Sequence, residues 1–361
     1  MSEFDHFVGT GSVSAQHALD EAALEQWLQA HLPGYCGPLR LEMFKGGQSN
    51  PTYKLITPGR SYVMRAKPGP VAKLLPSAHA IEREFTVMRG LQGSDVPVPE
   101  MLCLCEDEGI IGRAFYVMEF VQGRVLWDQS LPDMSPPQRA DIYDAMNRVI
   151  AALHTVPYAE RGLAGYGKPG NYFERQIGRW SRQYVASVTA PIPEMDELMA
   201  WLPAHIPAMA RDDSMVRIVH GDFRLDNLLF DADQPRVLAV LDWELSTLGH
   251  PLADFSYHCM AWHIPPGAFR GIGGLDLAGL GIPSEADYIA RYCERTGIAT
   301  PAQLQADWNF YMAYNMFRMA AILQGIAKRL EDGTASSAQA VSAAAGARPL
   351  AQMAWQFAQR A

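Results

Sequence analysis

The segment 218–227, which reads IVHGDFRLDN, constrains this chain more than any other feature. An aspartate, Asp222, directly follows His-Gly, and Asn227 stands five residues beyond it. A second acid, Asp242, ends a short apolar run further along. One acid can orient a hydroxyl nucleophile while an asparagine and another acid hold magnesium on phosphates. The spacing therefore predicts phosphoryl-transfer chemistry.

Two short apolar segments, 228–230 and 237–241, surround a polar turn at 231–235 and predict a β-hairpin. The hairpin sets Asn227 at one end and Asp242 at the other, on adjacent strands, so that their side chains can converge on one metal ion. Asp222 would then orient the acceptor hydroxyl for in-line attack on the γ-phosphoryl group. In the alternative interpretation this is a structural turn, in which Asp222 caps a neighbouring segment and Asn227 holds a loop.

Two neighbours of these residues receive lesser roles. We expect His220 to fix the loop by hydrogen bonding rather than to act as a general base. Asp226 is expected on the opposite face of a strand from Asn227, as an outer contact or a substrate contact.

The hydrophobic pattern changes period along the chain and predicts an α+β fold. Residues 1–24 form a lead-in, which includes Asp20 as the N-cap of a first helix. Residues 25–121 predict a small antiparallel β-sheet lobe with one main helix, and residues 122–361 a larger, mostly helical lobe. The predicted strands of the first lobe are 39–43, 52–57, 61–67, 101–105 and 114–121, and its main helix is 80–91. The predicted helices of the second lobe are 135–153, 171–188, 194–201, 252–262, 284–296, 302–330 and 335–360.

The first lobe also carries residues suited to holding phosphates. A loop of Gly46, Gly47, Gln48, Ser49 and Asn50 lies between two predicted strands, and glycine lets backbone N–H groups approach an anion closely.

A cation on the third predicted strand, 61–67, could reach the α- and β-phosphates. Arg65 is the first candidate and Lys67 the alternative, while Glu84, or Glu82 instead, could pair with it from the next helix. A Gly-Gly hairpin and exposed strand charges are the structural alternatives.

The composition of the chain limits the classes of molecule that it is expected to bind. The 361 residues carry a net charge of −9 with a pI near 5.6, which argues against a nucleic-acid surface. No apolar run approaches the roughly 20 residues of a membrane helix, and the first residues do not resemble a signal peptide. Five cysteines without a paired spacing predict buried free thiols. We therefore expect a cytoplasmic protein that binds small molecules.

Taken together, these motifs resemble the aminoglycoside phosphotransferase family within the protein-kinase-like fold. The resemblance rests on the glycine loop, Arg65, Glu84, the His220-Gly221-Asp222…Asn227 motif and Asp242-Trp243-Glu244. Segments 63–65, 118–123 and 242–254 are most similar to the subgroup of phosphotransferase domains fused to, or encoded beside, acyl-CoA dehydrogenases.

The resemblance implies a bilobal kinase-like fold that uses ATP or GTP with Mg²⁺. It also implies that Glu119, Phe120 and Val121 form the hinge whose backbone meets the purine, and that Asp254 supports the loop around Asp222. Asp242-Trp243-Glu244 departs from the Asp-Phe-Gly of protein kinases, and little room remains for an activation loop. Protein substrates are therefore not expected.

The leading hypothesis is an ATP-dependent kinase that phosphorylates a hydroxyl of a small molecule. The subgroup resemblance implies a hydroxyacyl-CoA acceptor and a functional link to an acyl-CoA dehydrogenase. Aminoglycoside, choline, homoserine or sugar kinases are alternatives, as is a catalytically silent nucleotide- or CoA-binding regulatory module. A metal hydrolase built on His250, His258, Cys259 and His263 is disfavoured, because these spacings match no standard zinc pattern.

Overall fold

The computed structural model describes residues 8–45, 50–69, 80–267, 271–333 and 338–361. The chain divides into two compact units. Unit 1 comprises Met1–Trp127, Tyr158–Tyr166 and Asn227–Ser246, and unit 2 comprises Asp128–Pro157, Gly167–Asp226 and Thr247–Ala361. The hairpin that follows the 218–227 segment thus belongs to unit 1, although Asp222 belongs to unit 2.

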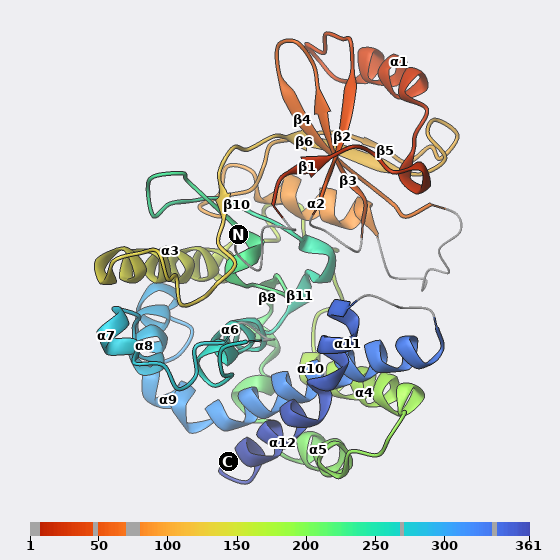
Figure 1. Cartoon of the computed structure of the whole chain (residues 1–361). Coiled ribbons are helices and arrows are strands. Elements are labelled where there is room, and N and C mark those ends of the chain that lie inside the picture. Colours follow the sequence, from red (N-terminus) through yellow and green to blue (C-terminus); the bar gives the residue numbers. More distant parts are fainter. Residues whose placement is uncertain (1–7, 46–49, 70–79, 268–270, 334–337) are drawn as a thin grey trace. The chain divides into compact units, whose positions relative to one another are not determined.

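Unit 1 is built on an antiparallel sheet with strand order β1-β2-β3-β4-β6-β5 (Figure 1). Its strands are β1 (Thr10–Gly11), β2 (Arg40–Phe44), β3 (Thr52–Ile56), β4 (Ser61–Ala66), β5 (Met101–Cys105) and β6 (Phe115–Glu119). Two longer helices of this unit are α1 (Glu21–His31) and α2 (Ile81–Leu91). As predicted, Asp20 caps α1, because its side chain accepts a hydrogen bond of 2.9 Å from the N–H of Ala23.

The period-two pattern of β4 separates the two faces of this sheet. Tyr62 and Met64 join a core cluster with Leu24 and Leu28 of α1. Successive side chains of a strand point to opposite faces, so Arg65 lies on the other face, where it meets α2. The strand geometry of β4 thereby directs one cation toward the helix.

The predicted hairpin is confirmed. Strands β9 (Leu228–Phe230) and β10 (Val237–Val240) pair antiparallel, and β7 (Arg124–Val125) extends them to a three-stranded sheet. Leu228 lies opposite Val240, and the N–H of Leu241 donates to the carbonyl of Asn227 over 2.8 Å. Asn227 and Asp242 are therefore brought to the same open end of the hairpin.

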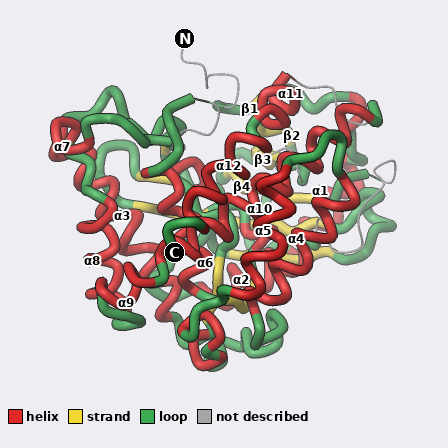
Figure 2. The backbone as a smooth tube through the Cα atoms, turned by 90° about the horizontal axis from the view of Figure 1, so that it is seen from below, coloured by secondary structure: helices red, strands yellow, loops and turns green. Residues whose placement is uncertain are grey.

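Unit 2 is mostly helical. In Figures 1 and 2, α10 runs alongside α4 and α12, and the residue contacts agree. A two-stranded sheet of β8 (Arg217–Val219) and β11 (Thr247–Gly249) belongs to the same unit. The helices are α3 (Pro136–Thr155), α4 (Tyr172–Ser187), α5 (Pro193–Ala204), α6 (Pro251–Cys259), α7 (Leu277–Leu280), α8 (Glu285–Thr296), α9 (Pro301–Ala306), α10 (Trp308–Glu331), α11 (Ala338–Ala345) and α12 (Ala347–Ala358). Short 3₁₀ turns occur in both units of the chain. They are Ala15–His17, Met209–Arg211, Asp213–Met215, Leu225–Asn227, Trp243–Leu245 and Met260–Trp262.

The predicted α+β class is confirmed, while several boundaries differ. Segment 302–330 was expected as one helix but breaks at Asp307, whose φ of −105° and ψ of 3° are not helical. Segment 335–360 breaks at Gly346, a residue type that costs about 1 kcal/mol in a helix interior. Hydrophobic periodicity continues across both breaks, so it did not reveal them.

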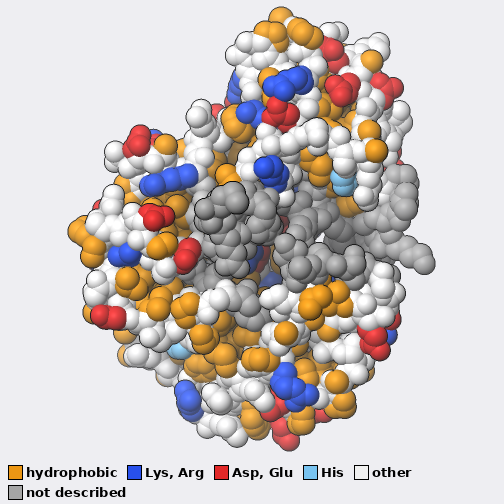
Figure 3. Space-filling view, in the orientation of Figure 1, with side chains coloured by type: hydrophobic (Ala, Val, Ile, Leu, Met, Phe, Trp, Pro, Cys, Tyr) orange, Lys and Arg blue, Asp and Glu red, His pale blue; other side chains and the backbone are white. Residues whose placement is uncertain are grey.

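The cysteines are all free thiols, as expected, although Cys36 is exposed and Cys103 is only partly buried. In the part of the chain that the structure describes, no helix is both long enough and apolar enough to cross a bilayer. On the face drawn in Figure 3, basic and acidic side chains are interspersed.

Helix α4 provides a matched test of the core. Phe173 is 0% exposed and packs against the rings of Phe310 and Tyr314, whereas Val185 on the same helix is 63% exposed. We predict that Phe173→Ala lowers the free energy of unfolding by about 3–5 kcal/mol, because it leaves a cavity. Val185→Ala should change it by about 0.5 kcal/mol or less. Urea unfolding of both variants measures this, and equal effects would contradict the assigned packing.

Candidate active site

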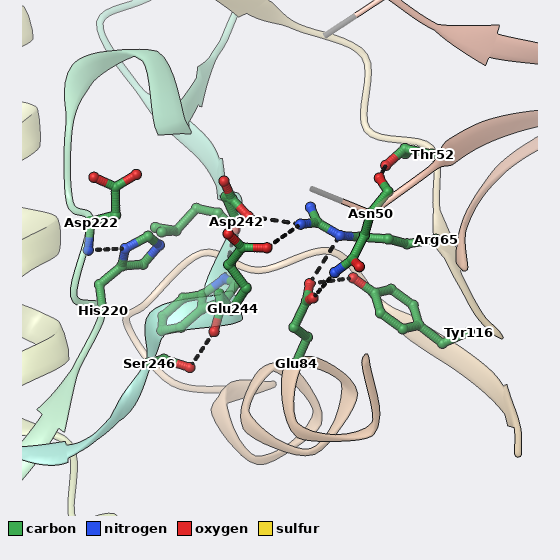
Figure 4. Close-up of polar contacts among 12 residues, drawn as sticks. Asn50, Thr52, Arg65, Glu84, Tyr116, His220, Asp222, Asp242, Glu244 and Ser246 are labelled. Atoms are coloured by element: carbon green, nitrogen blue, oxygen red, sulfur yellow. Dashed lines mark hydrogen bonds and ion pairs between the residues drawn. The ribbon is translucent and has the colours of Figure 1, made fainter. Parts of the chain in front are cut away.

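Arg65 gathers three carboxylates in unit 1 (Figure 4). Its Nε lies 3.2 Å from Oε2 of Glu84, and its Nη2 lies 2.8 Å from Oδ1 of Asp242 and 3.5 Å from Oε2 of Glu244. The Arg65 side chain is 11% exposed and that of Glu84 only 1%. We call Arg65, Glu84, Asp242 and Glu244 the Arg65 group. The predicted pair of Arg65 and Glu84 forms, and the alternative pair of Lys67 and Glu82 forms as well, at 3.4 Å and with more exposed side chains.

Glu84 is held from two further directions. The amide of Asn50 donates to its Oε1 over 2.9 Å, and the phenol of Tyr116 donates to its Oε2 over 3.1 Å (Figure 4). Burial raises the pKa of Glu84, and the charge of Arg65 offsets part of that rise. The side chain of Asn50 therefore anchors α2, while Gly46, Gly47, Gln48 and Ser49 of the predicted phosphate cradle lie outside the described residues.

The charges of the Arg65 group do not balance. Burial alone would lower the pKa of Arg65, but the carboxylates, Glu84 foremost, raise it above its ordinary value, so the guanidinium stays protonated. With ionised acids, three carboxylates around one guanidinium leave the group with a net charge of −2. Negative charge concentrated on buried and partly buried side chains is unfavourable without a counter-charge. A divalent cation would neutralise the group.

The open end of the hairpin offers oxygen donors for such an ion. Asp242 has a left-handed backbone conformation, with φ of 64°, which is uncommon for a residue other than glycine. Its side chain is 33% exposed, and Asn227, the last residue of the 3₁₀ turn before β9, supplies a carboxamide. Magnesium prefers oxygen ligands and combines one or two carboxylates with phosphate oxygens. The donor set therefore fits Mg²⁺.

Glu244 was not among the predicted site residues. It stands two residues after Asp242, in the 3₁₀ turn Trp243–Leu245, and its carboxylate forms an ion pair with Arg65. The acid-x-acid spacing was the available signal.

In unit 2, Asp254 of α6 supports the loop around Asp222, as the resemblance implied. Its Oδ2 accepts from the backbone N–H of His220 over 2.7 Å, and its Oδ1 from that of Gly221 over 2.8 Å. Nε2 of His154 lies 3.2 Å from Oδ2. Asp254 thus satisfies two consecutive backbone donors of a buried loop.

His220 is buried, and its Nδ1 accepts from the N–H of Asp222 over 3.2 Å (Figure 4). This contact agrees with a role in fixing the loop.

The Asp222 carboxylate meets several side chains of unit 2. Tyr257 donates its phenolic hydrogen to Oδ1, and Nε of Arg224 lies 3.1 Å from the same oxygen. Arg224 also reaches Asp226, with Nη2 3.3 Å from Oδ2. The expectation that Asp226 lies on a strand is wrong, because it belongs to the 3₁₀ turn Leu225–Asn227.

Arg318 of α10 was also missed by sequence reasoning. Its Nη2 donates to the carbonyl of Gly221 over 2.6 Å, although it lies 97 residues further along the chain. No local motif marks this contact, which depends on the packing of unit 2.

The predicted hinge residues lie at the end of β6, where Glu119 is the last residue of the strand and Phe120 and Val121 follow it. The N–H of Glu119 donates to the carbonyl of Glu100 over 2.9 Å. The ring of Phe120 lies 6.4 Å from that of Phe44, and Nζ of Lys54 lies 4.2 Å from its centroid. The backbone of Glu119 thus bonds to the residue that precedes β5, while the role of Glu119, Phe120 and Val121 toward a purine stays a prediction.

The residues considered for a metal hydrolase have structural partners. Nε2 of His250 lies 3.1 Å from the carbonyl of Met209, and Nε2 of His258 lies 2.7 Å from the hydroxyl of Tyr288. Among residues with a described placement, no three His, Cys, Asp or Glu side chains form a metal-binding cluster.

Comparison with known proteins places the chain in a family of phosphotransferases with the kinase-like fold. Residues 40–305 match the phosphotransferase enzyme family, and the chain belongs to that family. Mouse acyl-CoA dehydrogenase family member 10 is 46% identical over 352 residues, which cover 97% of this chain and 32% of the mouse protein. Chicken acyl-CoA dehydrogenase family member 11 is 40% identical over 367 residues, covering 98% of this chain and 45% of that protein. The chain thus spans less than half the length of these relatives.

Solved structures give the same fold. A crystal structure from Ralstonia eutropha JMP134, of a protein provisionally assigned as an aminoglycoside phosphotransferase, has 62% identity and a TM-score of 0.87. The match covers 95% of this chain and 99% of that one.

Two more distant structures share the fold alone. A thermostable variant of the aminoglycoside phosphotransferase APH(4)-Ia, bound to ADP and hygromycin B, has 20% identity and a TM-score of 0.57, covering 93% of this chain and 98% of that one. A microcompartment-associated aminopropanol kinase has 19% identity and a TM-score of 0.60, covering 94% and 97% respectively.

The pKa of Asp254 generates a pH prediction. Burial alone would raise this pKa, but the hydrogen bond from His154 and those from the loop lower it below its ordinary value. The ionised carboxylate of Asp254 therefore stabilises the folded state fully above its unfolded-state pKa of about 4. This stabilisation is lost as pH falls through the lower folded-state pKa.

We predict that Asp254→Asn reduces the free energy of unfolding by about 3 kcal/mol at pH 7. The difference from the native chain should shrink below about pH 4, because the asparagine does not titrate. Urea unfolding from pH 3 to pH 7 measures it. A difference that stays constant across this range would contradict the assignment.

Proposed function

We propose that the chain is an ATP-dependent phosphotransferase that moves the γ-phosphoryl group to a hydroxyl of a small molecule. The placement of Asp242 beside Arg65, at the hairpin end that also presents Asn227, carries this proposal. Asp242 follows the open end of a hairpin that also presents Asn227, and Glu244 stands two residues further on, so carboxylate and carboxamide oxygens gather beside one guanidinium. A magnesium–nucleotide complex supplies the divalent cation that such a group requires.

The residues of unit 1 take nucleotide-binding roles in this proposal. Asn227 and Asp242 hold Mg²⁺, which, when bound, neutralises charge on the phosphate oxygens. Arg65, oriented by Glu84, contacts the phosphates. The loop of Gly46, Gly47, Gln48, Ser49 and Asn50 cradles them, and the backbone of Glu119, Phe120 and Val121 meets the purine. GTP is the alternative phosphoryl donor.

Asp222 takes the role of the acid that orients the acceptor hydroxyl and accepts its proton. Positioning and charge neutralisation dominate the catalysis of phosphoryl transfer, so a rigidly held carboxylate is the main requirement. The backbone bonds from the loop to Asp254 provide that rigidity.

We further propose a hydroxyacyl-CoA as the acceptor and an acyl-CoA dehydrogenase as a functional partner. The names of the mouse and chicken relatives support this substrate class. An aminoglycoside is the second candidate, favoured by the assignment of the Ralstonia eutropha protein.

A transfer assay with γ-labelled ATP and Mg²⁺ tests the proposal. Hydroxyacyl-CoAs of several chain lengths, aminoglycosides, choline and simple sugars serve as acceptors. We expect label on a hydroxyacyl-CoA, and Asp222→Ala should lower kcat by about 10²–10⁴-fold. Label on an aminoglycoside alone would overturn the acyl-CoA assignment. Nucleotide binding without any transfer would instead favour a regulatory module.

The hairpin provides a matched pair of variants for the metal role. Asp242→Asn removes a charge at its open end, and we expect the Mg²⁺ concentration for half-maximal activity to rise about 10-fold or more. Asp231→Asn removes an equal charge at the turn, where Asp231 pairs with Arg236 at 2.9 Å, and should leave the Mg²⁺ dependence unchanged. Magnesium titrations of ATP turnover measure both, and matching shifts would exclude a specific role for Asp242.

A further inference from the structure

Helix α6 contacts the 220–222 loop through two residues, of which only one was expected from the sequence. Asp254 accepts hydrogen bonds from the backbone of His220 and Gly221. Tyr257, three residues later on the same helix, donates to the carboxylate of Asp222. Residues three apart share a helix face, so one face of α6 fixes both the backbone and the functional side chain of the loop.

The ring of Tyr257 is itself held in place. It is buried, and the guanidinium carbon of Arg318 lies 5.0 Å from its centroid. Arg318 also donates to the carbonyl of Gly221, so it contacts both the ring and the loop. A cation facing the ring is attracted to it, with a larger gain where water is excluded. Tyr257 therefore has one defined position relative to Asp222.

The chemistry of the phenol limits what Tyr257 can do. Burial, and then the charge of Asp222, raises the pKa of Tyr257 above its ordinary value. The hydroxyl therefore stays protonated near neutral pH and acts as a donor, so it cannot serve as a base.

We propose that Tyr257 is a positioning residue that fixes the orientation of the Asp222 carboxylate during phosphoryl transfer. The inference rests on the proposed function, because it presumes that Asp222 orients the acceptor. A carboxylate joined by single bonds can rotate, and a reacting group displaced by about 1 Å can cost about 100-fold in rate. The bond from Tyr257 removes that freedom before the acceptor arrives.

Tyr257→Phe tests this role, with Tyr288→Phe as the matched control. Each variant deletes one buried phenolic hydroxyl in unit 2, but the hydroxyl of Tyr288 bonds to His258 and not to Asp222. The probe is Mg-ATP turnover by the full chain, measured as phosphate release to water and as transfer to the acceptors named above. Unfolding midpoints of both variants establish that they fold.

We expect Tyr257→Phe to lower kcat by about 10- to 100-fold while the KM for ATP changes less than about twofold. Tyr288→Phe should keep the native kcat. A Tyr257→Phe variant with native kcat would overturn the proposal, as would equal loss of kcat in both variants or a rise in KM alone. If the native chain turns over no Mg-ATP in either assay, the proposed function itself fails, and the positioning role with it.

Discussion

The buried ion pair between Arg65 and Glu84 is the interaction on which the rest of unit 1 depends. It joins β4 to α2, and the same guanidinium reaches Asp242 and Glu244 at the end of the hairpin. Breaking a buried pair by removing one partner costs about 3–5 kcal/mol, because the remaining charge is left without compensation. Asn50 and Tyr116, which are uncharged, also donate hydrogen bonds to the carboxylate of Glu84. Strand, helix and hairpin are therefore fixed to one another by a single cation.

In unit 2 the carboxylate of Asp254 joins helix α6 to the loop around Asp222, much as Arg65 joins elements of unit 1. Asp254 is a buried residue of α6 that accepts hydrogen bonds from two consecutive N–H groups of the loop. Tyr257 of the same helix donates a hydrogen bond to the side chain of Asp222. A loop cannot bury its own backbone donors without partners. The acid on α6 thus allows a tight, buried loop to present one functional carboxylate.

The sequence predicted the parts of the molecule that local rules determine. The period-two pattern placed Arg65 on the face that meets α2, and the apolar runs around residues 231–235 placed Asn227 and Asp242 on one hairpin. Glu244 and Arg318 were missed for different reasons. Glu244 depends on a left-handed turn at Asp242, and Arg318 on the packing of a helix that is distant along the chain. Periodicity reports neither kind of constraint.

Calorimetric titration of the full chain with ATP, in the presence and absence of Mg²⁺, tests the central claim most directly. The claim is that a metal–nucleotide complex neutralises the negative charge of the Arg65 group. It predicts saturable binding with Mg²⁺ that weakens by about 10-fold or more when the metal is removed. Equal affinity with and without Mg²⁺, or no binding of ATP at all, would contradict it.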